Sequence, residues 1–156
     1  MFGFPNDTPE KMREIIEGYL KYITVDRPDL PSAVFRPVVV ECDPETPKLT
    51  VAYPIKDGML NTSGIAHGAI ISMAYDITMG IMARWHQHGT MSPTLTMSFE
   101  FSKAVPVNST FVIEATAVAS ARHTVDFVAK GWIEGDSDTI VNRAQGRYFI
   151  YKAMEE

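Results

Sequence analysis

A single aspartate lies inside a long apolar stretch of the sequence. Asp76 is the only formally charged side chain between Asp57 and Arg84, and residues 65–83 around it are apolar on nearly every side. Because an unpaired charge among apolar groups costs several kcal/mol, sequences seldom keep one there without a chemical use. We therefore interpret Asp76 as a reactive carboxylate that acts as a general base or as a nucleophile.

The start of the same stretch offers a second reactive element, because its pattern predicts a buried helix. The first N–H groups of a helix lack intrahelical partners and carry a partial positive charge. Gly68 has no side chain to block approach, so its N–H is suited to stabilise a developing oxyanion. A carboxylate and a helix terminus together indicate a site for general-base or nucleophilic chemistry that needs no cofactor.

His67, which precedes Gly68, cannot easily meet Asp76 along one helix. The two residues are nine positions apart, about 2.5 turns and roughly 13 Å along a helix axis, so they lie on opposite faces. If both act on one substrate, the simplest arrangement places them opposite each other across a two-fold axis. We expect a homodimer, or a dimer of dimers, whose monomer is inactive.

Period-two patterns predict a sheet that must hold this helix. Residues 38–41 and 49–53 favour a hairpin. Four further segments predict an antiparallel meander and cover residues 94–101, 110–119, 124–133 and 140–151. The predicted fold class is α+β, an antiparallel sheet of about six strands wrapped around one long apolar helix, in a single domain of residues 1–156.

An additional helix is predicted before the sheet. Thr8 is suited to be its N-cap and Pro9 occupies the first helical position, followed by apolar residues at helical spacing. This N-terminal extension, residues 1–35, could cover a substrate pocket or extend a subunit contact.

Composition restricts the classes of function. The formal net charge of −5 disfavours nonspecific nucleic-acid binding, and Cys42 is the only cysteine, so no intramolecular disulfide can form. The N-terminus lacks the pattern of a secretory signal, and we expect a cytoplasmic protein. Residues 65–83 are long enough to span a bilayer, but their polar members argue against a membrane helix. The four histidines show no zinc-ligand spacing.

The combination of Asn61, the triplet His67-Gly68-Ala69 and the later Asp76 resembles the PaaI-like acyl-CoA thioesterases, which have the hotdog fold. The resemblance continues at residues 93–97 and 144–147 and covers roughly residues 38–152. It implies hydrolysis of an acyl-CoA or aryl-CoA thioester to the free acid and coenzyme A, at a site shared by two subunits.

The resemblance also implies roles for individual residues. The Gly68 N–H would bind the thioester carbonyl oxygen, and Asp76 of the partner would act as nucleophile or general base. Asn61 and His67 would lie near the thioester, and Thr94 would orient water. Each has a structural alternative: His67 as a helix cap, Asp76 bonded to backbone N–H groups of a strand, Asn61 as a turn former, Thr94 as an ordinary strand residue.

Three further residues are candidates for substrate binding. Ala69 stands where the family has a second glycine, Tyr75 could line the acyl pocket or pack on the sheet, and Arg122 could hold a coenzyme A phosphate. Two alternatives to a thioesterase stay open. One is a noncatalytic acyl-CoA-binding hotdog module, and the other is a hotdog dehydratase.

Overall fold

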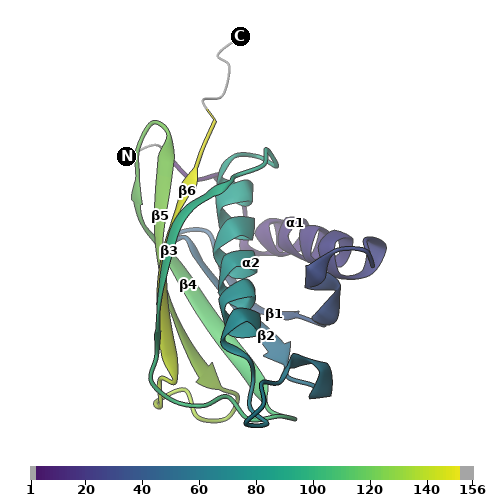
Figure 1. Ribbon diagram of the computed structural model, residues 1–156. Helices are drawn as coiled ribbons and strands as arrows, with labels where there is room; N and C mark the ends of the chain where they lie inside the picture. Colours follow the sequence, from purple (N-terminus) through teal and green to yellow (C-terminus); the bar gives the residue numbers. More distant parts are fainter. Residues whose placement is uncertain (1–2, 152–156) are drawn as a thin grey trace.

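The computed structural model describes residues 3–151 and shows one antiparallel sheet curved around a long helix (Figure 1). The long helix is α2 (Gly68–His86), and α1 (Pro9–Lys21) packs against it. The strands are β1 (Val38–Asp43), β2 (Lys48–Pro54), β3 (Thr94–Phe101), β4 (Thr110–Ser120), β5 (Thr124–Ile133) and β6 (Asn142–Phe149). Short helical turns cover Tyr22–Asp26, Pro31–Val34 and Asp57–Met59. The predicted α+β class is confirmed; residues 1, 2 and 152–156 of the predicted domain lie outside the described residues.

The sheet order corrects the predicted four-stranded meander. The strands follow the order β1-β2-β4-β5-β6-β3, so only β4, β5 and β6 form a meander and β3 pairs with β6 at the far edge. Consecutive strands pair when a tight turn joins them. Residues 102–109, which connect β3 to β4, do not form such a turn and are bonded to another part of the chain. The Ala66 N–H donates to Val105 O, which ties this connection to the segment before α2. The prediction that β3 lies next to β4 was therefore wrong.

Helix α2 is covered on one side by the sheet and left open on the other. Its buried face includes Tyr75, Met79 and Met82. A second stripe remains partly or fully exposed in the chain and consists of Ala69, Ile70, Met73, Asp76, Ile77 and Gly80. A helix that is apolar on all sides must be covered on all sides. We therefore expect another protein surface to pack on this stripe.

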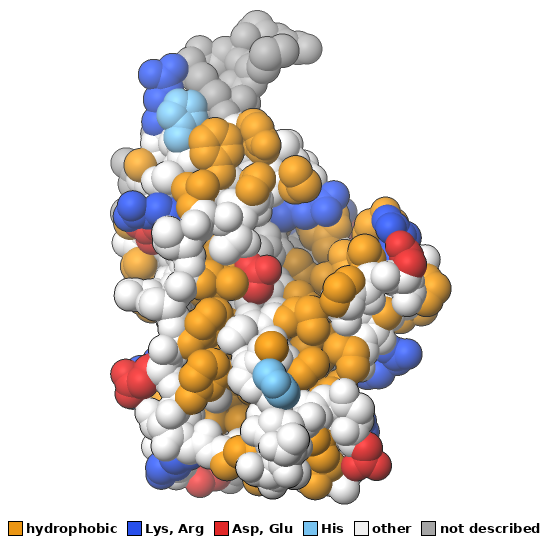
Figure 2. Space-filling model, viewed as in Figure 1, with side chains coloured by type: hydrophobic (Ala, Val, Ile, Leu, Met, Phe, Trp, Pro, Cys, Tyr) orange, Lys and Arg blue, Asp and Glu red, His pale blue; other side chains and the backbone are white. Residues whose placement is uncertain are grey.

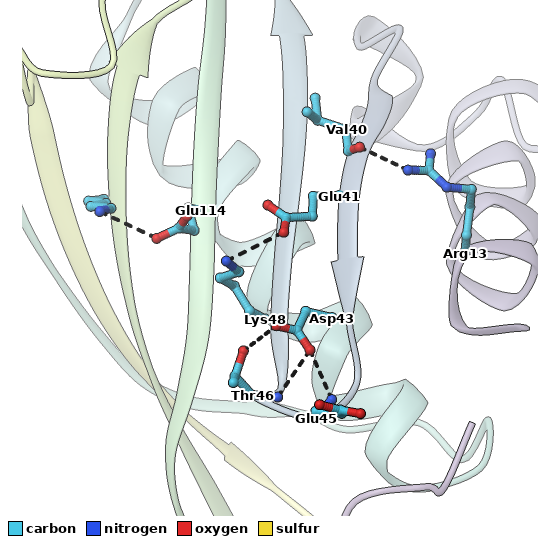
Figure 3. Close-up of polar contacts among 9 residues, drawn as sticks. Arg13, Val40, Glu41, Asp43, Glu45, Thr46, Lys48 and Glu114 are labelled. Atoms are coloured by element: carbon cyan, nitrogen blue, oxygen red, sulfur yellow. Dashed lines mark hydrogen bonds and ion pairs between the residues drawn. The ribbon is translucent and has the colours of Figure 1, made fainter. Parts of the chain in front are cut away.

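The predicted hairpin and N-terminal helix are both confirmed. β1 pairs antiparallel with β2, and the Thr8 hydroxyl accepts a hydrogen bond from the Lys11 N–H at 3.2 Å. Figure 3 shows Arg13 of α1 reaching the edge of β1, where its guanidinium donates to Val40 O at 2.8 Å and to Val39 O at 2.7 Å. These bonds satisfy carbonyl groups on a strand edge that α1 also covers.

The segment before α1 packs on the C-terminal end of α2. The ring of Phe4 lies 4.1 Å from that of His86 and 5.8 Å from that of Trp85. The Trp85 indole N–H donates to the Asp7 carboxylate at 2.9 Å. The N-terminal extension therefore covers the end of α2 that lies farthest from Gly68.

Candidate active site

Asp76 lies in the middle of α2, half-buried, and two hydroxyl groups bond its carboxylate. Thr94 Oγ1 donates to Asp76 Oδ1 at 2.7 Å, and the Tyr148 hydroxyl donates to the same oxygen at 2.9 Å. The structural alternative for Asp76 required backbone N–H donors from a strand. Within residues 3–151 the carboxylate instead has side-chain donors, from β3 and β6.

Tyr148 is a functional candidate that the sequence reasoning missed. Its side chain is fully buried, and its ring packs edge-on against Phe127 with ring centroids 5.7 Å apart. A Cβ at Gly146 would come within 2.9 Å of this ring, so glycine there makes the room that the ring occupies. A signal was available, because Gly146 and Tyr148 share one face of a strand that alternates buried and exposed residues.

The hydroxyl of Tyr148 stays protonated at neutral pH. Burial, and after it the adjacent Asp76 carboxylate, raises the pKa of Tyr148 well above its ordinary value of 10. A buried phenol beside a carboxylate avoids a second negative charge by keeping its proton. Tyr148 is thus a hydrogen-bond donor to Asp76 throughout the pH range in which carboxylates ionise.

The N-terminus of α2 contains the second candidate group, the N–H of Gly68. His67 is the N-cap, and its Nδ1 accepts the Ala69 N–H at 3.0 Å, in agreement with the capping alternative. Gly68 follows as the first helical residue, so its N–H has no intrahelical acceptor. A pocket of about 310 Å³ opens beside Gly68, and its walls include Ile71, Phe101 and Lys103.

Asn61 lines the same pocket, but its side-chain oxygen accepts hydrogen bonds within a turn. Its Oδ1 accepts the N–H of Ser63 at 2.9 Å and, more weakly, that of Ile65 at 3.4 Å. Gly64, inside this turn, has a φ of +74°, a conformation that favours glycine. This geometry agrees with the turn-forming alternative for Asn61, while its place in the pocket keeps it within reach of a ligand.

The two candidate groups do not meet within one chain. Gly68 and Asp76 are eight positions apart on α2, which is about 12 Å along the helix axis. The structure therefore brings Thr94 and Tyr148 to Asp76, and His67 and Asn61 to Gly68, as two separate groups.

The predicted substrate-binding residues lie in three different environments. Tyr75 is fully buried, packs edge-on against Phe111 and donates a hydrogen bond to Asn142 O at 3.2 Å, which agrees with the packing alternative. Ala69 is exposed at the first turn of α2. Arg122 is exposed between β4 and β5, at the end of the sheet near the C-terminus of α2.

The face that carries Asp76 is largely apolar. Figure 2 shows hydrophobic side chains gathered over β3 and along the open side of α2. Leu95 and Phe101 of β3 are about half exposed, at 49% and 52%. Within residues 3–151, β3 has no strand partner on its outer edge. An apolar helix stripe beside a free strand edge is a surface that another protein surface could cover.

No group of three or more metal-ligating side chains occurs among the described residues. No helix between residues 3 and 151 has both the length and the apolar character needed to cross a membrane.

The sequence profile of the thioesterase superfamily matches residues 63–140, which is half of the chain. This range contains Gly68, Asp76 and Thr94. A sequence comparison with curated proteins finds no match.

Solved structures share the fold at low sequence identity. The Escherichia coli PaaI protein superposes with a TM-score of 0.75 at 11% identity, covering 94% of this chain and 98% of its own. Zebra fish thioesterase superfamily member 2 gives 0.74 at 12% identity, covering 94% and 100%. The protein smu.793 from Streptococcus mutans, bound to acetyl CoA, gives 0.67 at 20% identity, covering 77% and 92%.

Proposed function

This chain belongs to the thioesterase superfamily and has the hotdog fold, and we propose that it hydrolyses an acyl-CoA or aryl-CoA thioester to the free acid and coenzyme A. The observation that carries the proposal is Asp76, a half-buried carboxylate bonded by two hydroxyl groups on an otherwise apolar surface. The acetyl CoA bound by the S. mutans protein of the same fold supports the substrate class.

The reaction needs an oxyanion donor and a carboxylate. The Gly68 N–H would bind the carbonyl oxygen as it gains negative charge. As a general base, Asp76 removes a proton from water while the water oxygen attacks the carbonyl carbon; the C–S bond then breaks and the thiolate of coenzyme A leaves. As a nucleophile, Asp76 forms a mixed anhydride with release of the thiolate, and water then hydrolyses the anhydride. Both routes give the same products.

We propose that the site forms between two subunits. Gly68 and Asp76 are too far apart on one helix to act on one carbonyl group, and the open stripe of α2 is apolar. A two-fold axis beside this stripe would place Gly68 of one chain opposite the partner's Asp76, giving two equivalent sites. The same contact would cover Ile70, Met73 and Ile77, which the chain alone leaves partly exposed.

Two basic residues are candidates to hold the coenzyme A phosphates. Lys103 lines the pocket beside Gly68, so it can act on a substrate bound by its own chain. Arg122 lies near the opposite end of α2, a helix of 19 residues and about 28 Å, so it can serve that pocket only from a partner subunit. A guanidinium and an ammonium both suit phosphate oxygens.

Turnover tests the proposal directly. Release of free coenzyme A from a panel of acyl, hydroxybenzoyl and phenylacetyl thioesters is followed with a thiol reagent. The native chain should release thiol, and Asp76→Asn, which keeps the shape of the side chain and loses its basicity, should lower kcat by orders of magnitude. Tight binding of a thioester without thiol release would instead support the noncatalytic acyl-CoA-binding module.

A further inference from the structure

The two hydroxyl groups that bond Asp76 donate to one and the same carboxylate oxygen. Thr94 Oγ1 lies 2.7 Å and the Tyr148 hydroxyl 2.9 Å from Oδ1, whereas no side chain among residues 3–151 bonds Oδ2. We propose that Thr94 and Tyr148 are positioning residues that together fix Oδ1, so that Oδ2 is the oxygen that reacts. This inference rests on the proposed function, in which Asp76 is the reactive carboxylate.

The strand register explains why two donors converge on one oxygen. Thr94 of β3 and Tyr148 of β6 are direct cross-strand partners, so their side chains leave the sheet next to each other and on one face. That face is the one that α2 packs against, and Asp76 lies at the corresponding level of the helix. The pair of hydroxyl groups is therefore fixed by sheet geometry and does not depend on a mobile loop.

The Tyr148 ring is held tightly in this position. A Cβ at Gly146 would lie 2.9 Å from the ring and 3.1 Å from the end of Met79, and one at Gly80 would lie 3.4 Å from the ring. The two glycines thus let the ring fit between β6 and α2. Because the ring cannot move far, its hydroxyl can hold the carboxylate in one rotamer.

This role differs from the role that the sequence suggested for Thr94. A threonine whose hydroxyl proton points at Asp76 orients the carboxylate, and it does not orient a water molecule with that proton. Removing either hydroxyl should therefore weaken catalysis, because the carboxylate can then leave the rotamer that the two hydrogen bonds hold.

The test compares two buried tyrosines that contact α2. Tyr148→Phe removes the hydroxyl at Asp76. Tyr53→Phe is the matched control, because the Tyr53 hydroxyl bonds that of Thr78 at 2.7 Å and is part of neither reactive group. For Tyr148→Phe we expect kcat to fall about 10- to 100-fold, the size of a hydrogen bond to a charged group. KM should change little, as expected for a residue that orients the reacting group and does not bind the substrate. Tyr53→Phe should keep the wild-type kcat and KM.

A second pair of variants protects the test against a folding defect. Thr94 is exposed, so Thr94→Val should fold normally and reproduce the fall in kcat, and Thr94→Ser, which keeps the hydroxyl, should restore the wild-type kcat. Wild-type kcat values in both Tyr148→Phe and Thr94→Val would overturn the inference.

An NMR measurement that does not depend on turnover separates this inference from the proposed function. The carboxyl carbon of Asp76 is followed by ¹³C NMR at one neutral pH and identified by its loss in Asp76→Asn. Its chemical shift should move in Tyr148→Phe and Thr94→Val, because each variant removes a hydrogen bond to Oδ1, and stay in place in Tyr53→Phe. A wild-type protein that releases no thiol would defeat the proposed function while this chemical shift still decides on the two positioning residues. An unmoved chemical shift in both variants would defeat the inference alone.

Discussion

Asp76 and Gly68 differ in how their surroundings prepare them. The Asp76 carboxylate accepts two hydrogen bonds, from the hydroxyl groups of Thr94 and Tyr148, which hold it in place. The Gly68 N–H is available to a ligand because the N-cap side chain of His67 binds a different N–H group. His67 binds the Ala69 N–H through Nδ1, which requires the imidazole proton to lie on Nε2, and the first N–H of α2 is left for a ligand.

Replacing Gly68 by proline should remove the oxyanion donor without disturbing the helix. Proline suits the first helical position, and His67 already has the extended conformation, with ψ 137°, that precedes a proline. A Cβ at this position would meet only the Phe101 ring, at 3.9 Å. Steady-state thiol release should show kcat reduced about 100- to 1000-fold.

Gly68→Ala is the control for that substitution, because it adds the Cβ and keeps the N–H. It should retain most of the wild-type kcat. Equal losses in the alanine and proline variants would show that space beside Gly68 matters and that its N–H does not.

Lys103 should contribute to binding of the coenzyme A phosphates. Lys103→Ala is expected to raise KM for an acyl-CoA up to about 5-fold, the range of an exposed ion pair. It should leave KM unchanged for the corresponding acyl-pantetheine, which lacks the phosphates. Arg122→Ala, assayed in parallel, reports whether Arg122, in the turn between β4 and β5 of the partner subunit, also contributes to phosphate binding. Equal effects on both substrates would contradict a phosphate contact at either residue.

The C-terminal end of α2 forms a unit with the segment before α1. His86 is buried under the Phe4 ring, its Nε2 lies 3.2 Å from the Ser120 hydroxyl, and its Nδ1 has no partner among the described residues. Burial, and to a lesser degree the charge of His88, lowers the pKa of His86 below its ordinary value of 6.5. The folded protein therefore keeps this imidazole neutral where the unfolded chain would protonate it.

This difference predicts a loss of stability in mild acid. Below about pH 6.5 the unfolded state binds a proton that the native state does not, so the free energy of unfolding falls as the pH drops toward the lower, native pKa. His86→Gln lacks the titrating group and should show a smaller fall over this interval. Urea unfolding between pH 7.5 and 5 measures how the free energy of unfolding changes with pH in the wild type and in His86→Gln. Equal pH dependences in the two proteins would contradict the prediction.

Features that depend on neighbouring residues in the sequence could be predicted, and contacts between distant strands could not. Asp76 and Gly68 could be chosen as candidates from the sequence because one charge in an apolar run and a glycine at a helix start are local signals. Thr8 and Pro9 marked the start of α1 in the same way. Tyr148 was missed because its contact with Asp76 spans 72 positions and depends on β3 pairing with β6. That pairing follows from the path of residues 102–109, which strand periodicity does not encode.

In the proposed mechanism, assembly determines whether Gly68 and Asp76 can act together. In one chain they are about 12 Å apart along α2, and the apolar stripe between them is uncovered. A dimer contact on this stripe would bury the apolar side chains and also bring Gly68 of one chain near the partner's Asp76. Burial of apolar surface would therefore drive the contact that completes the site. Dilution to a verified monomer should abolish thiol release, and full activity in such a monomer would contradict a shared site.

The most direct test mixes two inactive variants. Asp76→Asn keeps the Gly68 donor, and Gly68→Pro keeps the carboxylate, so a heterodimer of the two has one intact site if each site takes one group from each chain. After unfolding and refolding as an equal mixture, half of the dimers should be heterodimers, and activity should return to about one quarter of the wild-type value. Each variant refolded alone should remain inactive. No recovery in the mixture, with heterodimers verified by mass spectrometry, would show that the two groups do not act across the interface.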